Sequence, residues 1–198
     1  MKIIDLNGFS LSSPYGDGEN YGQPLGVKSI GIVEVHTDAG FIGIGETYSG
    51  VYTPELINPI VKYLKTLIIG QNPREIDKIN KLLEIPFISG TGLIKSIISA
   101  IDIALWDIKG QVKGQPIAKL LNEHMNSSVK VYASGGSIAM TEDEISVDVE
   151  KIIKNEFTAY KMRVGLQTWA KDLSRVNTAR EKVGIENSLM VDAIMGTV

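Results

Sequence analysis

The chain has 198 residues, with 20 Lys and Arg against 23 Asp and Glu, a formal net charge of −3 and a hydrophobic content of 43%. This is the composition of a globular protein, and without a basic excess there is no electrostatic argument for nucleic-acid binding. The absence of cysteine excludes disulfides, thiolate metal sites and a cysteine nucleophile. Apolar runs are too short for a membrane-spanning helix, and Asp5 and Asn7 fall where a signal peptide needs its apolar stretch. We therefore expect a cytoplasmic protein with neither membrane nor nucleic-acid partners.

The N-terminal quarter of the chain alternates in the manner of β-strands. Residues 2–6 predict a weak first strand, and the Gly-, Pro- and Tyr-containing residues 12–26 predict a loop. Residues 29–36 and 41–46 alternate on either side of the turn Asp38-Ala39-Gly40. This pattern predicts an antiparallel hairpin within a three-stranded meander.

Helical periodicity follows. Thr53-Pro54-Glu55 predicts a helix start with Pro in the first helical position, and apolar residues recur at helical spacing over 56–67. Asn72-Pro73-Arg74-Glu75 predicts the start of a second helix, and residues 92–111 predict a third that contains alanines suited to close approach. Residues 1–125 are therefore expected to form an α+β unit, a three-stranded meander plus helices.

The remainder of the chain alternates between strand and helix patterns in the order β-α-β-α-β. The strands are expected at 129–136, 159–165 and 188–192, and the helices at 141–154 and 168–183. Thr141 and Glu144 are spaced as a capping box at the start of the first of these helices. The repeat is typical of a parallel sheet or a (β/α) barrel, so residues 126–198 are expected to form a partial barrel.

Charged residues stand at the predicted strand ends, where ligands bind in parallel α/β folds. Lys161 and Arg163 are two residues apart on a strand and point the same way, whereas Met162 points to the opposite face. Two inward-directed cations need an anion between them, and Asp192 can hold a divalent metal or pair with these cations. A metal with cations binds a carboxylate and stabilises an enolate. The alternative is that Lys161 and Arg163 are surface residues and that Asp192 caps its strand.

Residues 99–121, SAIDIALWDIKGQVKGQPIAKLL, resemble the helix that links the capping domain to the barrel in the enolase superfamily. The similarity is to the mandelate racemase and muconate-lactonizing branch, and the order of elements agrees with it, including a Lys-x-Lys-like strand end and Val-Asp-Ala on the third strand. The resemblance implies an α+β capping domain over residues 1–125 and, over residues 126–198, the first β/α units of a TIM-type barrel, which is incomplete.

The resemblance also implies a chemistry: Mg²⁺-dependent abstraction of the proton α to the carboxylate of a small substrate, giving a stabilised enediolate. Asp192 corresponds to the first metal ligand, and Lys161 to the first Lys of the catalytic pair, which supports the substrate carboxylate. Arg163 replaces the second Lys, normally the base, and Ile194 replaces a common Asn. Because arginine is effectively always protonated, we expect an electrostatic role for Arg163 and a base on a later strand. This favours dehydration of a small sugar acid or hydroxy acid.

Two loops, near residues 15–25 and 45–55, select the substrate in this family. The resemblance therefore implies that Tyr15, Tyr21, Tyr48 and Tyr52 bind substrate. Ordinary loop packing is the alternative for each of them.

The family's other metal ligands lie on strands that follow the third. Three strands do not close an eight-stranded barrel, and one carboxylate does not make a Mg²⁺ site. We expect a lyase or isomerase of the mandelate racemase/muconate lactonizing type, a homo-oligomer, of which the 198-residue chain is truncated and inactive by itself. The alternatives are a racemase or cycloisomerase of the same superfamily, or a non-catalytic truncated module that self-associates.

Overall fold

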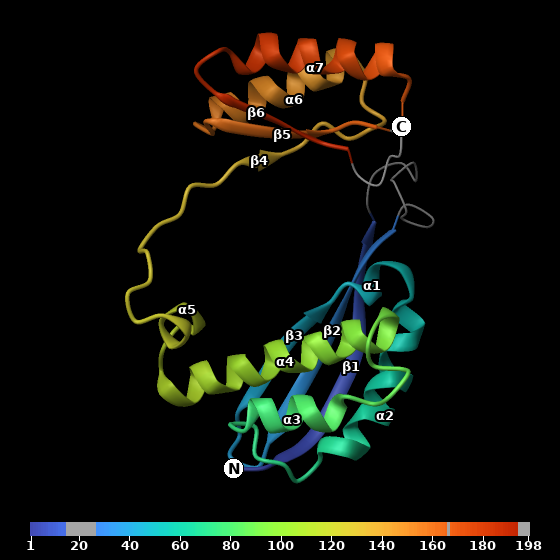
Figure 1. Ribbon diagram of the computed structural model, residues 1–198, viewed down its shortest axis with the longest axis vertical. Coiled ribbons are helices and arrows are strands. Elements are labelled where there is room, and N and C mark those ends of the chain that lie inside the picture. The colour runs from blue at the N-terminus through green and yellow to red at the C-terminus, as the bar shows by residue number, and fades with distance from the viewer. Residues whose placement is uncertain (15–26, 166, 194–198) are drawn as a thin grey trace. The chain divides into compact units, whose positions relative to one another are not determined.

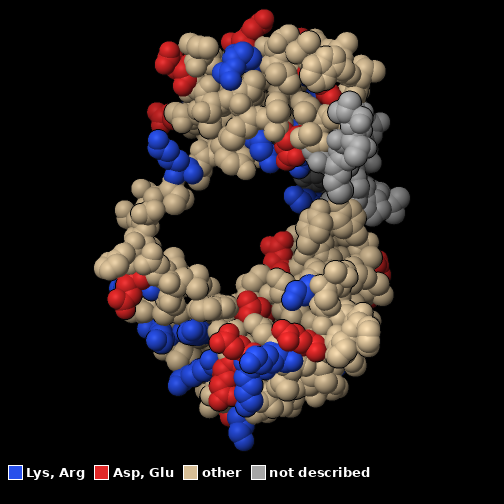
Figure 2. All heavy atoms as spheres, in the orientation of Figure 1, with Lys and Arg blue, Asp and Glu red and all other residues tan. Residues whose placement is uncertain are grey.

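The computed structural model describes residues 1–14, 27–165 and 167–193, and its chain divides into two compact units, Met1–Met125 and Asn126–Val198 (Figure 1). Each unit has its own hydrophobic core. Within the described ranges, no helix has the length and apolar character to cross a membrane. On the face drawn in Figure 2, acidic and basic side chains are intermixed over the first unit.

The first unit contains a three-stranded antiparallel sheet in the order β1-β2-β3, as the alternation predicted. The strands are β1 Ile3–Pro14, β2 Val27–Thr37 and β3 Ile42–Thr47. Strand β1 is longer than expected, because pairing with β2 extends it into residues predicted as loop. Ser13 pairs with Lys28, and the hydroxyls of Ser12 and Ser29 lie 2.8 Å apart.

Helices follow the sheet. They are α1 Ser49–Tyr52, the 3₁₀ turn η2 Pro54–Leu56, α2 Ile57–Ile68, α3 Ile76–Leu83, α4 Gly92–Lys113 and α5 Ile117–Leu121. Of these, α1, η2, α2 and α4 pack on the strands of the sheet. The helical segment starts where it was expected, with Thr53 at the N-cap position and Pro54 in the first helical position, but its first turn is the 3₁₀ turn η2 and the α-helix α2 begins only at Ile57. The Thr53 hydroxyl instead donates to the Ser49 carbonyl, 3.2 Å away, so it completes the unexpected α1 rather than capping the next helix.

Contact between α4 and β3 explains the alanines of the long helix. A Cβ atom on Gly45 would lie 1.9 Å from the Ala100 carbonyl oxygen, and one on Gly43 would lie 2.0 Å from that of Ala104. Because both glycines lack a side chain, the helix backbone packs directly on the strand. The buried side chains of Ile97, Ile101, Leu105 and Ile108 then complete the core.

The second unit contains a parallel sheet in the order β4-β5-β6, with two helices on one face (Figure 1). Its elements are β4 Ala133–Ser134, α6 Glu142–Lys154, β5 Ala159–Arg163, α7 Trp169–Val183 and β6 Ser188–Asp192. The capping box at Thr141 and Glu144 is confirmed. The strand predicted at 129–136 is reduced to two residues, because only Ala133 and Ser134 pair with β5, while residues 129–132 are exposed.

Candidate functional site

Strand β5 places its side chains alternately on the two faces of the parallel sheet. Tyr160 and Met162 are fully buried in the core formed with α6 and α7. Lys161 is partly exposed and Arg163 is exposed. The expected direction of Lys161 and Arg163, opposite to Met162, is therefore found. Their face of the sheet is the one left uncovered by the helices.

An ion pair joins the ends of β5 and β6. The Lys161 ammonium donates to Asp192 Oδ2 at 2.9 Å, and the two side chains are 25% and 39% exposed. The parallel register, in which Arg163 aligns with Asp192, brings these residues together from 31 positions apart in the chain. The hydrogen bond to Asp192 raises the pKa of Lys161, although partial burial and the charge of Arg163 oppose that effect. Lys161 is thus a cation at neutral pH.

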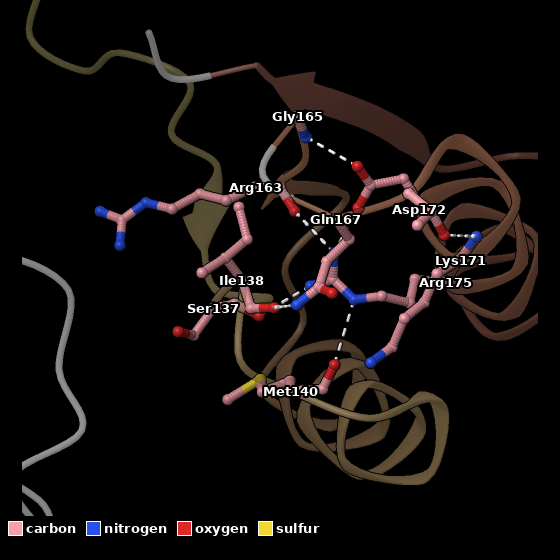
Figure 3. A network of polar contacts seen from close by, with 10 residues as sticks. Ser137, Ile138, Met140, Arg163, Gly165, Gln167, Lys171, Asp172 and Arg175 are labelled. Atoms are coloured by element: carbon pink, nitrogen blue, oxygen red, sulfur yellow. Dashed lines mark hydrogen bonds and ion pairs between the residues drawn. The ribbon is translucent and has the colours of Figure 1, made fainter. Parts of the chain in front are cut away.

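The backbone of Arg163 is engaged, while its side chain extends away from the buried polar network (Figure 3). Its N–H donates to the Gly136 carbonyl at 3.0 Å, and its own carbonyl accepts from Arg175 Nη1 at 3.2 Å. The guanidinium is consequently a second exposed cation at the carboxyl edge of the sheet.

A metal site needs more oxygen ligands than this edge supplies. Within residues 1–14, 27–165 and 167–193 there is no group of three His, Asp or Glu side chains suited to a metal ion. Asp192 contributes one carboxylate, and Mg²⁺ requires near-octahedral oxygen coordination. The described residues therefore do not form a Mg²⁺ site by themselves, and of the two roles expected for Asp192 the structure shows the pairing with a cation.

The expected substrate-binding tyrosines belong to the first unit. Tyr48 and Tyr52 are 67% and 47% exposed, with their hydroxyl oxygens 3.0 Å apart and their rings edge to face at a centroid distance of 5.4 Å. The hydrogen bond between the two hydroxyls raises the pKa of Tyr52. Tyr15 and Tyr21 lie outside the described residues. Substrate binding by all four tyrosines stays a prediction.

Sequence reasoning missed two charged residues of α7. Arg175 is fully buried and Asp172 is 7% exposed, and they form an ion pair of 2.9 Å. Both lie on the buried stripe of the helix with Ala179 and Val183. The helical spacing of Asp172 and Arg175 with Ala179 and Val183 is the sequence signal for this pair, because an arginine and an aspartate in the apolar stripe of a helix indicate a buried polar network.

An antiparallel sheet covered by helices, followed by parallel β/α units with charged strand ends, defines the class: a capping domain followed by the beginning of a (β/α) barrel. The family model described as "Mandelate racemase / muconate lactonizing enzyme, N-terminal domain" matches residues 24–122. The chain belongs to this family of the enolase superfamily.

Characterised relatives and solved structures agree with this assignment. The chain is 35% identical over 195 residues to an L-talarate/galactarate dehydratase of Salmonella typhimurium, covering 96% of this chain and 49% of the relative. It is 31% identical over 203 residues to an N-succinyl-L-Arg/Lys racemase of Bacillus cereus, covering 99% and 53%. A crystal structure of the Salmonella dehydratase, liganded with Mg and L-lyxarohydroxamate, superposes with a TM-score of 0.84 at 30% identity, covering 100% of this chain and 53% of that one. The chain spans about half the length of the curated relatives it matches.

Proposed function

We propose that this chain carries part of the active site of a Mg²⁺-dependent enzyme that abstracts the proton α to a carboxylate and dehydrates a small sugar acid or hydroxy acid. The observation that carries the proposal is the Lys161–Asp192 pair, 2.9 Å apart at neighbouring carboxyl ends of parallel strands in a chain of this family. The similarity to an L-talarate/galactarate dehydratase favours dehydration. Racemisation and cycloisomerisation, the activities named for other relatives, are the alternatives.

In this proposal Lys161 binds the substrate carboxylate. Its ammonium lies at the carboxyl edge of the parallel sheet beside Asp192, where a positively charged donor can hold an anion. Arg163, always protonated, adds a second positive charge on the same face of β5 and lowers the energy of the enediolate electrostatically. The base that removes the proton lies on a later strand.

Asp192 is proposed as one ligand of the metal, with its remaining ligands supplied from outside the described residues. A bound Mg²⁺ supplies Lewis-acid stabilisation of the enediolate charge. Tyr48 and Tyr52, together with Tyr15 and Tyr21, are proposed to contact the substrate. We further propose that the protein is cytoplasmic and homo-oligomeric, and that the 198-residue chain is inactive by itself.

The test uses two proteins: the 198-residue chain, and a fusion of residues 1–193 to the corresponding C-terminal remainder of the Salmonella dehydratase. Each is incubated with galactarate, L-talarate and other acid sugars, with Mg²⁺ or with a chelator. Loss of the α-proton and the β-hydroxyl yields a 2-keto-3-deoxy acid, which is measured as its semicarbazone. We expect product only from the fusion and only with Mg²⁺.

Matched variants of the fusion test the roles of the residues. Lys161→Met and Asp192→Asn are each expected to lower kcat/KM by about 100-fold or more, as removal of a transition-state electrostatic contact does. Lys130→Met changes an exposed lysine of the same unit and is expected to leave activity unchanged. A folded fusion that turns over no acid sugar contradicts the dehydration proposal, and full activity in Lys161→Met contradicts the role of that lysine.

A non-catalytic, self-associating module is the second candidate. It is favoured by the exposure of apolar side chains around the parallel sheet, where Val131 is 63% and Val191 is 55% exposed. Sedimentation of the 198-residue chain over a range of concentrations tests it. The module is supported if the chain self-associates, if Val191→Lys abolishes that self-association, and if Mg²⁺ does not stabilise the chain.

A further inference from the structure

Arg175 of α7 is the largest fully buried side chain in the part of the chain that the structure describes. Burying a guanidinium is costly unless its charge and its donors are all satisfied. Asp172, one helical turn earlier, neutralises the charge at 2.9 Å. This ion pair alone leaves most of the five N–H donors of the guanidinium to be accounted for.

Three of the remaining donors join two separate segments of backbone (Figure 3). Nε donates to the Met140 carbonyl at 3.1 Å and Nη2 to the Ser137 carbonyl at 2.7 Å, both in the loop that follows β4. Nη1 donates to the Arg163 carbonyl, at the end of β5, at 3.2 Å. One side chain therefore binds the carboxyl ends of two neighbouring strands together.

Asp172 extends the network to the turn that follows β5. Its Oδ2 accepts the N–H of Gly165 at 2.8 Å, and Gly165 has a φ of +98°. Gln167, in the turn before α7, donates from Nε2 to the Ile138 carbonyl at 3.2 Å. Polar contacts that start from α7 and the turn before it thus hold the backbone at Arg163 and Gly165 and the loop that follows β4.

We propose that Arg175 is a positioning residue: through the main-chain carbonyls it binds, it fixes the carboxyl end of β5 against the loop after β4 and so sets where Lys161 and Arg163 lie. A site on strand ends works only if its side chains are held to within a fraction of an ångström. That Lys161 and Arg163 act on a substrate rests on the proposed function. The positioning itself rests on the contacts of Arg175 alone.

Helix α7 supplies a matched control. Arg180 also donates from Nη1 to main-chain carbonyls, those of Gly184 at 2.9 Å and Asn187 at 3.0 Å. These residues precede β6, so Arg180 acts at the amino edge of the sheet, whereas Arg175 acts at the carboxyl edge. If Arg175 only stabilises the fold, replacement of either arginine should lower the stability of the unit in the same way.

The experiment compares Arg175→Met, Arg175→Lys and Arg180→Met in the 198-residue chain. Thermal unfolding gives the overall loss of stability, and native-state hydrogen exchange reports the amides of Arg163 and Gly135, which donate to Gly136 and Lys161 across the strand ends. In Arg175→Met we expect protection of these two amides to fall about tenfold more than that of the Tyr160 amide near the amino end of β5. In Arg180→Met, the protection of these two amides is expected to fall only as much as that of the other amides of the second unit.

Arg175→Lys separates charge from geometry. A lysine keeps the charge opposite Asp172 but loses the planar fork that reaches three carbonyls, so we expect part of the stability to return while exchange at Arg163 stays fast. The proposal is overturned if, in all three variants, hydrogen exchange at the Arg163 and Gly135 amides changes only as much as the overall loss of stability predicts. If Arg175→Met does not fold, Arg175→Lys still decides, because its unchanged protection at Arg163 is the contrary result.

The same variants in the fusion enzyme connect the positioning to catalysis. Arg175→Lys is expected to lower kcat more than it changes KM, with Arg180→Met leaving both near the parent values. Normal kinetics together with accelerated exchange at Arg163 overturns the catalytic relevance of the positioning. An inactive parent fusion rejects the proposed function instead, and the exchange measurements on the chain still decide the role of Arg175.

Discussion

At the scale of single residues, Asp5 of β1 shows how one ion pair makes stability depend on pH. Lys65 of α2 donates to Asp5 Oδ1, and the N–H of Leu6 donates to the same atom at 2.8 Å. These contacts, the bond from Lys65 first, hold the pKa of Asp5 below its ordinary value of 3.8. A carboxylate whose pKa is lower in the folded state stabilises the fold above pH 3.8, and the contribution is lost as the pH falls through the folded pKa.

Asp5→Asn is therefore expected to lower the free energy of unfolding at pH 7 and to match the parent in strong acid. Because the Lys65 and Asp5 side chains are 36% and 40% exposed, solvent screens the pair and the loss at pH 7 is at most about 1 kcal/mol. Urea unfolding at a series of pH values measures it, with Glu123→Gln, an exposed carboxylate, as the control. A difference that persists below the folded pKa contradicts the linkage.

At the scale of elements, the backbone contact between β3 and α4 has no room for a methyl group. Gly45→Ala places Cβ within 1.9 Å of the Ala100 carbonyl oxygen, so helix and strand must separate. We expect a loss of about 1–3 kcal/mol, the usual cost of overpacking. Gly90→Ala is the control, because nothing lies within 4 Å of its added Cβ. Calorimetry that finds equal stability for both variants refutes the close contact.

The capping box of α6 gives a second prediction at this scale. Thr141 Oγ1 accepts the Glu144 N–H at 3.3 Å, and the Glu144 carboxylate accepts the Thr141 N–H at 2.8 Å, which lowers the pKa of Glu144. Thr141→Ala is expected to cost about 1 kcal/mol of stability, typical of a lost N-cap. Thr178→Ala, in the middle of α7, is the comparison. If Thr141→Ala costs no more than Thr178→Ala by thermal unfolding, the box does not stabilise the helix.

At the scale of the whole molecule, the segment that joins the two units is exposed along its whole length. Residues 122–132 contain no helix or strand, and all of them are exposed. We expect brief digestion with trypsin to cleave first after Lys130, leaving fragments that mass spectrometry assigns to residues 1–130 and 131–198. Lys130→Gln should remove this first cut. Initial cleavage inside α4 or α7 instead would contradict the division into two compact units.

Many features of the fold can be predicted from sequence patterns over a few neighbouring residues. Alternation along β5 correctly separates Lys161 and Arg163 from Met162, and the spacing of Thr141 and Glu144 correctly predicts the capping box. The motif over residues 99–121 indicates the family without knowledge of any tertiary contact, and the family model matches residues 24–122. These features depend on residues a few positions apart, for which the periods of strand and helix are sufficient.

Tertiary structure alone decided the lengths of two strands and the long-range polar contacts. The length of β1 depends on its register with β2, and the shortness of β4 depends on which residues reach β5. The ion pair of Lys161 with Asp192 and the binding of Ser137 by Arg175 join residues 31 and 38 positions apart. Local sequence determined which side chains stand at the strand ends. Long-range packing, which sets the register and decides which charges are buried together, determined what those side chains contact.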